Sequence, residues 1–285
     1  MLSVEHVTKS FGKLTVLEDV SLSFEAGVYG LLAPNGAGKT TLIRMLATLV
    51  YPTRGQILWD GEDIYGLGEA YRGLVGYLPQ DFGFYPGYTP RRFLRYVAAL
   101  QRISRREADA RIDELLGLVS LTQVADKKMR QFSGGMVQRV GIATAMVADP
   151  RILILDEPTA GLDPRERVRF RNLTHALARD RIVILSTHIV SDVESIAGKI
   201  VLIKDRRVLS CAPPSEVCAD LAGKVFEMPA GAPLPPDALL LSEREGAQGG
   251  IVRICADACP PDGVPVDPSL EDAFLSIYRD SEIVR

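Results

Sequence analysis

The chain has 285 residues, of which 47% are hydrophobic and 24% are charged, and its formal net charge is −3. This composition is typical of a soluble globular protein with room for one large domain and a smaller appendage. It excludes the bulk positive charge of a general nucleic-acid or anionic-lipid binder, so we expect no nucleic-acid partner.

No stretch approaches the ~18 uninterrupted apolar residues of a membrane span. The first residues, which include Glu5 and Lys9, do not resemble a signal peptide. The four cysteines match no zinc-binding pattern, and free thiols are typical of a cytosolic protein. We therefore predict a cytoplasmic location.

The N-terminal part of the chain leads into a glycine-rich turn. Residues 2–7 and 20–24 alternate between apolar and polar side chains, which predicts antiparallel strands, and the apolar residues 28–32 predict a further strand. Residues 33–41 read Ala-Pro-Asn-Gly-Ala-Gly-Lys-Thr-Thr, and a helix is predicted from Thr41. Such a turn directs backbone N–H groups and the positive end of a helix toward one point, which suits a phosphate chain.

Two side chains of this turn add to the phosphate site. Lys39 supplies a mobile positive charge for the β- and γ-phosphates, and the Thr40 hydroxyl can ligate Mg²⁺. Ala33 stands where the strict pattern has glycine. Alanine is suitable wherever φ is negative, and Pro34 biases position 33 toward extended backbone. The chain is therefore predicted to bind a nucleoside triphosphate.

In the middle of the chain the pattern changes from strands to aromatic, turn-forming and helical segments. Strands are predicted at 56–59 and 75–78, and residues 81–90 are rich in aromatic and turn-forming side chains. Helices are predicted at 91–100 and 105–119. Together these segments indicate an inserted helical subdomain at about 81–149.

Regular alternation of strands and helices then returns. The continuous apolar run 152–155 predicts a strand buried on both faces, and 182–186 repeats it after a helix predicted at 165–179. This order favours a mostly parallel sheet that is covered on both sides. Residues 200–203 and 207–209 indicate a hairpin.

Proline and glycine become frequent beyond residue 223. Strands are predicted at 238–241 and 251–255, and a last helix at 269–278. Its start signal is either Asp267 before Pro268 or Ser269 with Asp272. These segments predict domains at 1–222 and 223–285, the second being a small α+β appendage.

Two further motifs carry chemistry. Asp156 and Glu157 follow the apolar run 152–155, at the end of a parallel strand where ligands bind. Asp156 can hold Mg²⁺, and Glu157 can orient or deprotonate the water that attacks the γ-phosphate. Ser133-Gly134-Gly135 opens a predicted helix at 136–147, where N–H groups and a hydroxyl could receive phosphate. Taken alone, Ser-Gly-Gly is also a common way to begin a helix.

Because these motifs occur together, residues 2–210 resemble the ATP-binding subunit of ABC transporters. The matching motifs occur in the family's order: Walker A at 33–41, the Q-loop Gln80, the signature Ser133-Gly134-Gly135, Walker B at 152–157, the D-loop 160–163 and the switch histidine His188. Phe11 occupies the place of the family's adenine-stacking aromatic. Phe132 and Met136 depart from the usual leucine and glutamine beside the signature glycines.

The resemblance implies an α/β fold of the P-loop ABC-ATPase type. Its sheet core would be mostly parallel, with an antiparallel β subdomain, the inserted helical subdomain and the C-terminal appendage. It also implies a set of ATP contacts: Phe11, Asn35, Gly36, Ala37, Gly38, Lys39, Thr40, Thr41, Ser133, Gly134, Gly135 and Asp163. Mg²⁺ would be held by Thr40, Gln80 and Asp156.

The resemblance further implies catalysis by Glu157, His188 and Gln80. His188 would hydrogen-bond the γ-phosphate and hold the water of Glu157. In this family the signature of one cassette completes the ATP site of a second cassette, so the functional unit is expected to be a dimer, most simply of two identical chains. The two cassettes would close with ATP and open after hydrolysis.

A separate membrane permease is the partner that the resemblance implies, and it would hold the chain on the inner face of the cell membrane. Phe82, Phe84, Tyr85 and Tyr88 follow Gln80 and are expected either to line the permease-docking groove or to form a local core. Residues 269–275 resemble the C-terminal helix of bacterial export subunits, which move drugs, lipids, polysaccharides or ions.

Two alternatives stay open at this point: an ABC ATPase that serves translation or DNA repair, and an unrelated P-loop kinase. The sequence does not name the cargo.

Overall fold

The computed structural model describes residues 1–246 and 249–279. The chain divides into two compact units, Met1–Cys211 and Ala212–Arg285. The sequence suggested a division at 222/223, whereas the structure divides the chain near the end of β10, the last strand that pairs within the sheets of the first unit. No helix among the described residues is long and apolar enough to cross a membrane.

The first unit begins with an antiparallel sheet in the order β2-β1-β4-β5. Its strands are β1 (Leu2–Phe11), β2 (Leu14–Phe24), β4 (Arg54–Trp59) and β5 (Glu62–Asp63). β1 pairs antiparallel with both β2 and β4, which confirms the predicted antiparallel strands. Two helices of four residues follow, α2 (Ile64–Leu67) and α3 (Glu69–Arg72). They are absent from the sequence-based prediction because one helical turn carries no periodic signal.

The second sheet has the order β10-β9-β3-β8-β7-β6. Its strands are β3 (Gly27–Leu32), β6 (Val75–Leu78), β7 (Ile152–Asp156), β8 (Ile182–Ser186), β9 (Lys199–Lys204) and β10 (Arg207–Ala212). The pairs of β3 with β8 and β9, and of β7 with β6 and β8, are parallel, as predicted. Every residue of β7 and β8 is buried, which explains their continuous apolar sequences.

The helices that follow these strands are α1 (Lys39–Leu46), α7 (Pro164–Leu177) and α8 (Val190–Glu194). Helix α1 starts two residues before the predicted Thr41, because Gly38 is already its N-cap. In the pairing register, Leu31 of β3 and Asp156 of β7 both lie beside Ser186 of β8. The carboxyl ends of these three strands therefore meet at one edge of the sheet, where ligands bind in such folds.

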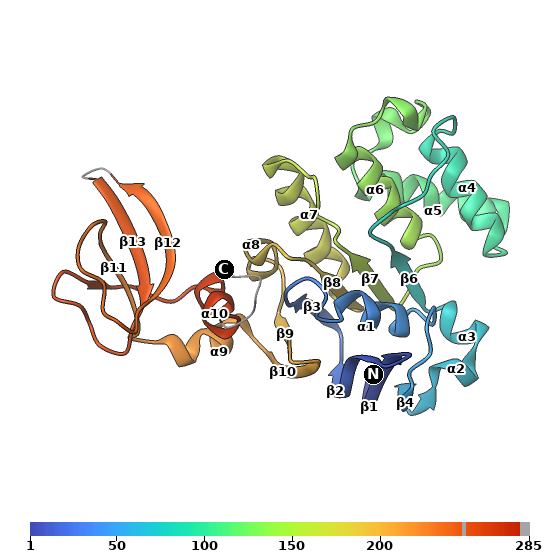
Figure 1. Ribbon diagram of the computed structural model, residues 1–285. Coiled ribbons are helices and arrows are strands. Elements are labelled where there is room, and N and C mark those ends of the chain that lie inside the picture. Colours follow the sequence, from blue (N-terminus) through green and yellow to red (C-terminus); the bar gives the residue numbers. More distant parts are fainter. Residues whose placement is uncertain (247–248, 280–285) are drawn as a thin grey trace. The chain divides into compact units, whose positions relative to one another are not determined.

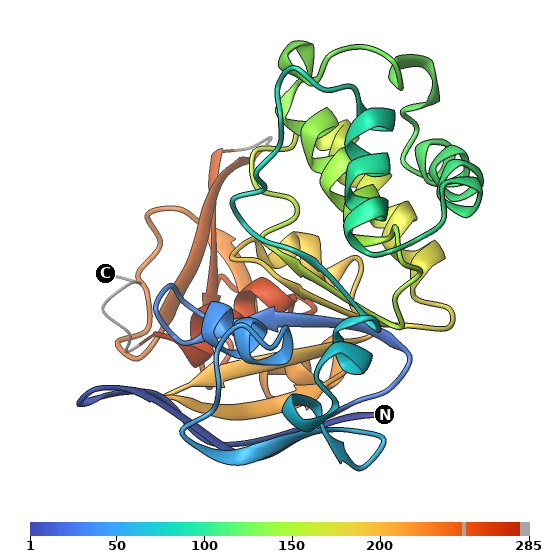
Figure 2. The same ribbon diagram turned by 90° about the vertical axis from the view of Figure 1, so that its right-hand side faces the viewer.

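A group of helices is inserted between β6 and β7. It contains α4 (Pro90–Leu100), α5 (Arg105–Leu118), α6 (Gly134–Ala145) and the short 3-10 helices η1 (Thr122–Val124) and η2 (Met129–Gln131). Thr89, Ser104 and Ser133 cap the three α-helices with their hydroxyl groups. Figures 1 and 2 both show α4, α5 and α6 gathered on the side of the central sheet opposite the N-terminal strands. This arrangement confirms the predicted helical insertion.

The second unit has a small antiparallel sheet in the order β12-β13-β11-β14. Its elements are α9 (Pro214–Cys218), η3 (Ala219–Leu221), β11 (Val225–Pro229), β12 (Leu239–Gly246), β13 (Gly249–Cys255), β14 (Val264–Pro265) and α10 (Leu270–Ile277). Ser269 and Asp272 form a capping box at the start of α10, which settles the start signal of this helix. β11 and β14 are absent from the sequence-based prediction because proline, which cannot donate to a sheet ladder, ends each of them.

Candidate active site

The loops that leave the carboxyl ends of β3, β7 and β8 enclose a cleft of about 420 Å³. The residues that line it are Val16, Asn35, Gly36, Gly38, Lys39, Thr40, Thr41, Gln80, Glu157, Ala160 and His188. The structure therefore brings the phosphate loop (residues 33–41) together with the predicted catalytic residues Gln80, Glu157 and His188.

The backbone of the phosphate loop requires two of its glycines. Gly36 has φ 79° and Gly38 has φ 106°, in the left-handed region that side chains disfavour. A Cβ atom on Gly38 would also lie 2.7 Å from Cδ2 of Leu17. Ala33, in contrast, is fully buried in the core and is not among the described residues with positive φ. The alanine at this position therefore causes no backbone strain.

Lys39 lies at the start of α1, with its side chain directed back into the phosphate loop. Its Nζ donates hydrogen bonds to the carbonyl oxygens of Ala33 and, at 3.1 Å, of Pro34. Burial lowers the pKa of Lys39, and the carboxylates of Glu157 and Asp156 oppose that shift. The cleft thus places the Lys39 amine at the N-terminus of helix α1, a position that favours a polyphosphate.

Asp156 is buried at the end of β7, and its neighbour Glu157 begins the next loop. The Ser186 hydroxyl donates a hydrogen bond of 2.6 Å to Oδ1 of Asp156. The backbone N–H of Glu157 donates to Ser186, at 3.1 Å to its carbonyl oxygen and at 3.2 Å to its hydroxyl. Ser186 thereby orients both acidic residues. It was missed in the sequence, where the available signal was a polar residue closing the buried run 182–186.

Glu157 has φ 50°, a conformation that side chains other than glycine, asparagine and aspartate rarely adopt. Its Oε2 lies 2.9 Å from Nδ1 of His188. Strained backbone at a ligand site persists only when its surroundings hold it, and Ser186 and His188 do so here. The pair of carboxylate and imidazole at the rim of the cleft is suited to general base catalysis.

The oxygen atoms near the cleft fit a magnesium ion. Thr40 and Gln80 line the cleft, and Asp156 lies buried next to Glu157. Mg²⁺ usually takes one or two carboxylates together with substrate phosphates and water, so it needs no large acidic cage. Consistently, the described part of the chain contains no cluster of three or more His, Cys, Asp or Glu side chains that could hold a metal ion.

Several predicted ATP contacts do not line this cleft. Phe11 is 51% exposed, with Nζ of Lys9 4.7 Å from the centre of its ring. Ala37 packs against the core. Asp163 caps α7 by accepting a hydrogen bond of 2.9 Å from the backbone N–H of Glu166.

Ser133, Gly134 and Gly135, which we call the signature turn, also lie outside the cleft. The Ser133 hydroxyl accepts a hydrogen bond of 3.2 Å from the backbone N–H of Met136. Gly134 has no positive φ, and a Cβ atom on it would meet nothing within 4 Å. Gly135 is buried against α7. Helix α6 thus begins with an exposed turn that has no side chain at Gly134.

The aromatic residues after Gln80 serve partly as a local core and partly as surface. The ring of Phe82 packs edge-on against that of Phe93, at 5.8 Å between centres. Tyr85, which is 49% exposed, lies 5.0 Å from Tyr88 and 5.7 Å from the exposed Tyr96. The ring contacts bear out the expected local core for Phe82, and docking of a permease at the exposed Tyr85 stays a prediction.

Comparison with known proteins agrees with this geometry. The family model described as "ABC transporter" matches residues 17–160. The Nod factor export ATP-binding protein I of Burkholderia lata is 35% identical over 230 residues, which cover 80% of this chain and 76% of that protein. The daunorubicin resistance ATP-binding protein DrrA3 of Streptomyces coeruleorubidus is 30% identical over 100% of this chain and 98% of its own.

Among solved structures, the dimeric structure of a bacterial ABC transporter cassette superposes with a TM-score of 0.67. It is 25% identical and covers 75% of this chain and 98% of its own.

Proposed function

This chain belongs to the ABC transporter family as an ATP-binding ATPase subunit, and from that premise we propose that two cassettes close on two ATP molecules to drive export through a separate membrane subunit. Membership in this family removes the alternative of an unrelated P-loop kinase.

The observation that carries the two-cassette proposal is the state of Gly134. Glycine is required in a protein where φ is positive or where a neighbour leaves no room for a side chain. Neither condition holds at Gly134 within this chain. Glycine in the first turn of a helix is also less stabilising than alanine. Close approach of a ligand held by another molecule accounts for the bare backbone, and the phosphate chain of a partner's ATP is that ligand.

The residues of the cleft supply the acceptor side of each site. We assign the phosphates to the N–H groups of residues 36–41 and to the Lys39 ammonium. To reach them, the Lys39 ammonium gives up its hydrogen bonds to the carbonyls of Ala33 and Pro34, and the Ala37 N–H gives up its bond to the Pro34 carbonyl. Phe11 stacks on the adenine. Gln80 and His188 orient the attacking water, and Glu157 accepts its proton; the contact of its carboxylate with Nδ1 of His188 fixes the direction of that carboxylate.

Mg²⁺ fits the oxygen donors Thr40, Gln80 and Asp156, and when bound it neutralises charge that develops on the phosphates. Ser186 keeps the Asp156 carboxylate in position for this role by donating a hydrogen bond to it.

Export as the direction of transport is supported by the relatives, which include a Nod factor export protein and a drug resistance protein. A membrane subunit needs a docking surface, and the exposed rings of Tyr85 and Tyr96 beside Tyr88 supply one. Through this contact the chain lies at the inner face of the cell membrane.

Glu157→Gln tests the two-cassette mechanism. This change keeps the shape of the side chain and removes the base, so ATP is bound and not hydrolysed, and the closed dimer accumulates. Size-exclusion chromatography is expected to show dimers with ATP and monomers with ADP. The double variant with Lys39→Ala should stay monomeric. A Glu157→Gln protein that remains monomeric at saturating ATP contradicts the mechanism.

The double change of Tyr85 and Tyr88 to alanine tests the docking surface. We expect ATP binding by the isolated subunit to be unchanged and transport in cells to be lost. Alanine at Tyr51, an exposed tyrosine of the antiparallel-sheet region, is the matched control. Normal transport by the double variant would count against docking at this surface.

A further inference from the structure

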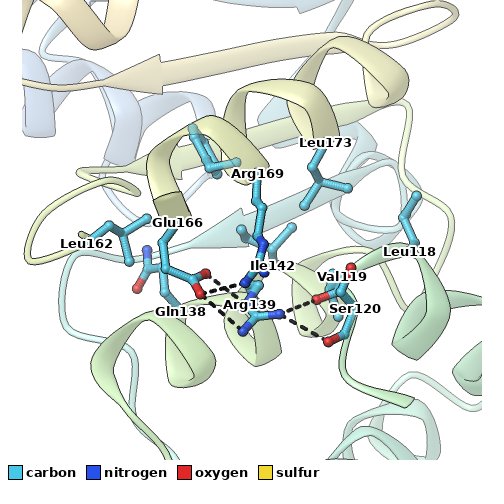
Figure 3. A pocket seen from close by; sticks show the side chains of 11 residues that line it. Leu118, Val119, Ser120, Gln138, Arg139, Ile142, Leu162, Glu166, Arg169 and Leu173 are labelled. Atoms are coloured by element: carbon cyan, nitrogen blue, oxygen red, sulfur yellow. Dashed lines mark hydrogen bonds and ion pairs between the residues drawn. The ribbon is translucent and has the colours of Figure 1, made fainter. Parts of the chain in front are cut away.

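A buried ion pair connects the signature turn to the helix that follows the D-loop. Arg139 lies on α6, Glu166 lies in the first turn of α7, and their side chains are 13% and 14% exposed. Nε of Arg139 is 3.1 Å from Oε2 of Glu166, and Nη2 donates to Oε1 at 3.4 Å. Figure 3 shows the two side chains directed toward each other in a small cavity, whose volume is about 30 Å³.

Glu166 occupies a position from which glutamate commonly caps its own helix. It is the third residue of α7 after the N-cap Asp163, and in a capping box its carboxylate would return to the backbone N–H of that residue. Only half of the box is formed here: the Glu166 N–H donates to Asp163. The carboxylate is directed instead to Arg139 and to the exposed Arg169, whose Nη1 lies 3.0 Å from Oε1.

The other end of the Arg139 guanidinium is bound to a third element. Its Nη1 donates to the carbonyl oxygens of Val119 at 2.9 Å and of Ser120 at 3.1 Å, just beyond the end of α5. Burial lowers the pKa of Arg139, and the Glu166 carboxylate opposes this effect. Because a buried guanidinium stays protonated, it requires this counter-charge, and removing one partner of such a pair is costly.

The stem of Glu166 also touches the signature turn directly. A Cβ atom on Gly135 would lie 3.1 Å from Cγ of Glu166 and 3.3 Å from Cδ2 of Leu162, which belongs to the D-loop. Glu166 therefore contacts Gly135 with its methylene groups, Arg139 with its carboxylate and Asp163 with its backbone. Any displacement of the signature turn relative to the D-loop has to break one of these three contacts.

We propose that Glu166 is a positioning residue for ATP hydrolysis: with Arg139 it holds the signature turn and the D-loop at a fixed separation, so that both reach the partner's nucleotide together. This inference rests on the two-cassette mechanism proposed above. It predicts a defect in the face that the chain offers to its partner and none in the chain's own phosphate loop. If Glu166 only stabilised the helical insertion, its replacement would not impair dimerisation while leaving ATP binding by the chain's own phosphate loop unchanged.

The first test is Glu166→Gln in the Glu157→Gln background, with Arg169→Gln as the matched control. The ATP concentration for half-maximal dimerisation is expected to rise about tenfold with Glu166→Gln, as for the loss of one buried network contact. Arg169→Gln removes an exposed partner and is expected to change it less than about twofold. Binding of a fluorescent ATP analogue to the monomer should be unchanged in both.

Equal dimerisation with and without Glu166→Gln overturns the inference, and so does a matching loss of ATP affinity in the monomer. Arg139→Lys provides the same comparison if Glu166→Gln does not fold. Failure of Glu157→Gln itself to dimerise contradicts the two-cassette mechanism rather than the role of Glu166.

The second test mixes two variants that retain Glu157, at an ATP concentration below the one that Glu166→Gln needs for half-maximal dimerisation. A mixed dimer of Lys39→Ala with Glu166→Gln has one site in which an intact phosphate loop faces an intact signature turn. At this ATP concentration the mixture is therefore expected to hydrolyse ATP faster than the sum of the two proteins measured separately. A mixture of Lys39→Ala with Gly134→Ala is the reference. Recovery in the reference without recovery with Glu166→Gln contradicts the inference.

Discussion

The phosphate loop and the signature turn are both glycine-rich entries to a helix, and they differ in what surrounds them. In the phosphate loop, Gly38 has φ 106° and is enclosed by Leu17, and the loop shares its cleft with Glu157 and His188. At the signature turn, Gly134 has no positive φ and no neighbour within 4 Å. The glycines of the first turn are needed by the fold of this chain, whereas the fold leaves room for a side chain at Gly134.

The supports behind the two turns differ as well. The phosphate loop continues from a central strand of a buried sheet, and Lys39 is hydrogen-bonded within the loop itself. The signature turn is held from behind by the Arg139–Glu166 pair and by the contact of Gly135 with Glu166. The phosphate loop is thus held by its own hydrogen bonds, whereas the signature turn is exposed and is held by an ion pair between α6 and α7.

The largest effect is expected from Lys39→Ala, which removes the charge of the phosphate loop. ATP binding and hydrolysis should fall by at least about 100-fold, because a preorganised charge directed at the phosphates is lost. Titration with a fluorescent ATP analogue and phosphate release measure both. Lys127→Ala, an exposed lysine of the helical insertion, should leave both unchanged. Near-normal ATP affinity in Lys39→Ala would contradict the assignment of the loop.

Gly134→Ala tests whether the glycine of the signature turn is needed for ATP hydrolysis and not for the stability of the fold. Alanine fits the helical backbone at this position, so the free energy of unfolding is expected to stay equal or to rise by up to about 1 kcal/mol. Hydrolysis should fall by about 100-fold, because the new methyl group blocks the approach of the partner's phosphates. Thermal unfolding and phosphate release, measured on the same preparation, check the two outcomes. Normal hydrolysis by Gly134→Ala would contradict contact of this glycine with the partner's phosphates. Loss of folding would contradict the claim that the fold leaves room for a side chain there.

Ser186→Ala tests whether Ser186 orients the two acidic residues of the cleft, Asp156 and Glu157. The change removes the donor to Asp156 and one acceptor for the Glu157 N–H. We expect kcat to fall about tenfold and the required Mg²⁺ concentration to rise, as for other groups that orient metal ligands. Ser195→Ala is the control, because it removes only a hydrogen bond from the residue after α8 to the Asp192 carbonyl within that helix. Unchanged Mg²⁺ dependence would argue against this role of Ser186.

Asp272→Asn tests the charge that stabilises the second unit, and ATP turnover is expected to be unchanged. Burial alone raises the pKa of Asp272, but hydrogen bonds from Arg253 and Ser269 outweigh it and the pKa is lowered. The stabilisation by the carboxylate is therefore complete above the unfolded value of about 3.8 and is lost as the pH falls through the folded pKa.

At pH 7, Asp272→Asn should lower the free energy of unfolding of the second unit by about 2 kcal/mol. Urea unfolding should show this difference narrowing below pH ~4. Glu271→Gln, at an exposed neighbouring position, should show neither change. A difference that persists at low pH would contradict the role of the charge.

Much of the fold could be predicted because its signals are local. The apolar run 152–155 is buried along its whole length, and the capping residues Ser104 and Ser269 begin the helices expected there. β11 could not be predicted, since its five residues run into proline and pair with strands from distant segments. The end of the first unit could not be predicted either, because only the strand order shows that β10 is the edge strand of the six-stranded sheet.

The candidate site divides in the same way. Lys39 and Glu157 could be expected from the glycine turn and the apolar strand that they follow, whereas Gln80 and His188 could be expected only from the resemblance to the family. Glu166 could be read only as a helix-capping residue, because its partner Arg139 lies on another helix. Ser186 resembled the end of an apolar strand, and only the register of β7 and β8 places its hydroxyl at Asp156.

The most direct test of the account is ATP hydrolysis by an equal mixture of Lys39→Ala and Gly134→Ala proteins. Each protein alone is expected to be inactive, since every site in its dimers lacks either the phosphate-loop charge or an open signature turn. The mixture should regain activity, because a mixed dimer contains one site with both halves intact. A mixture as inactive as its two components would contradict the claim that the two glycine turns act on one nucleotide from two chains.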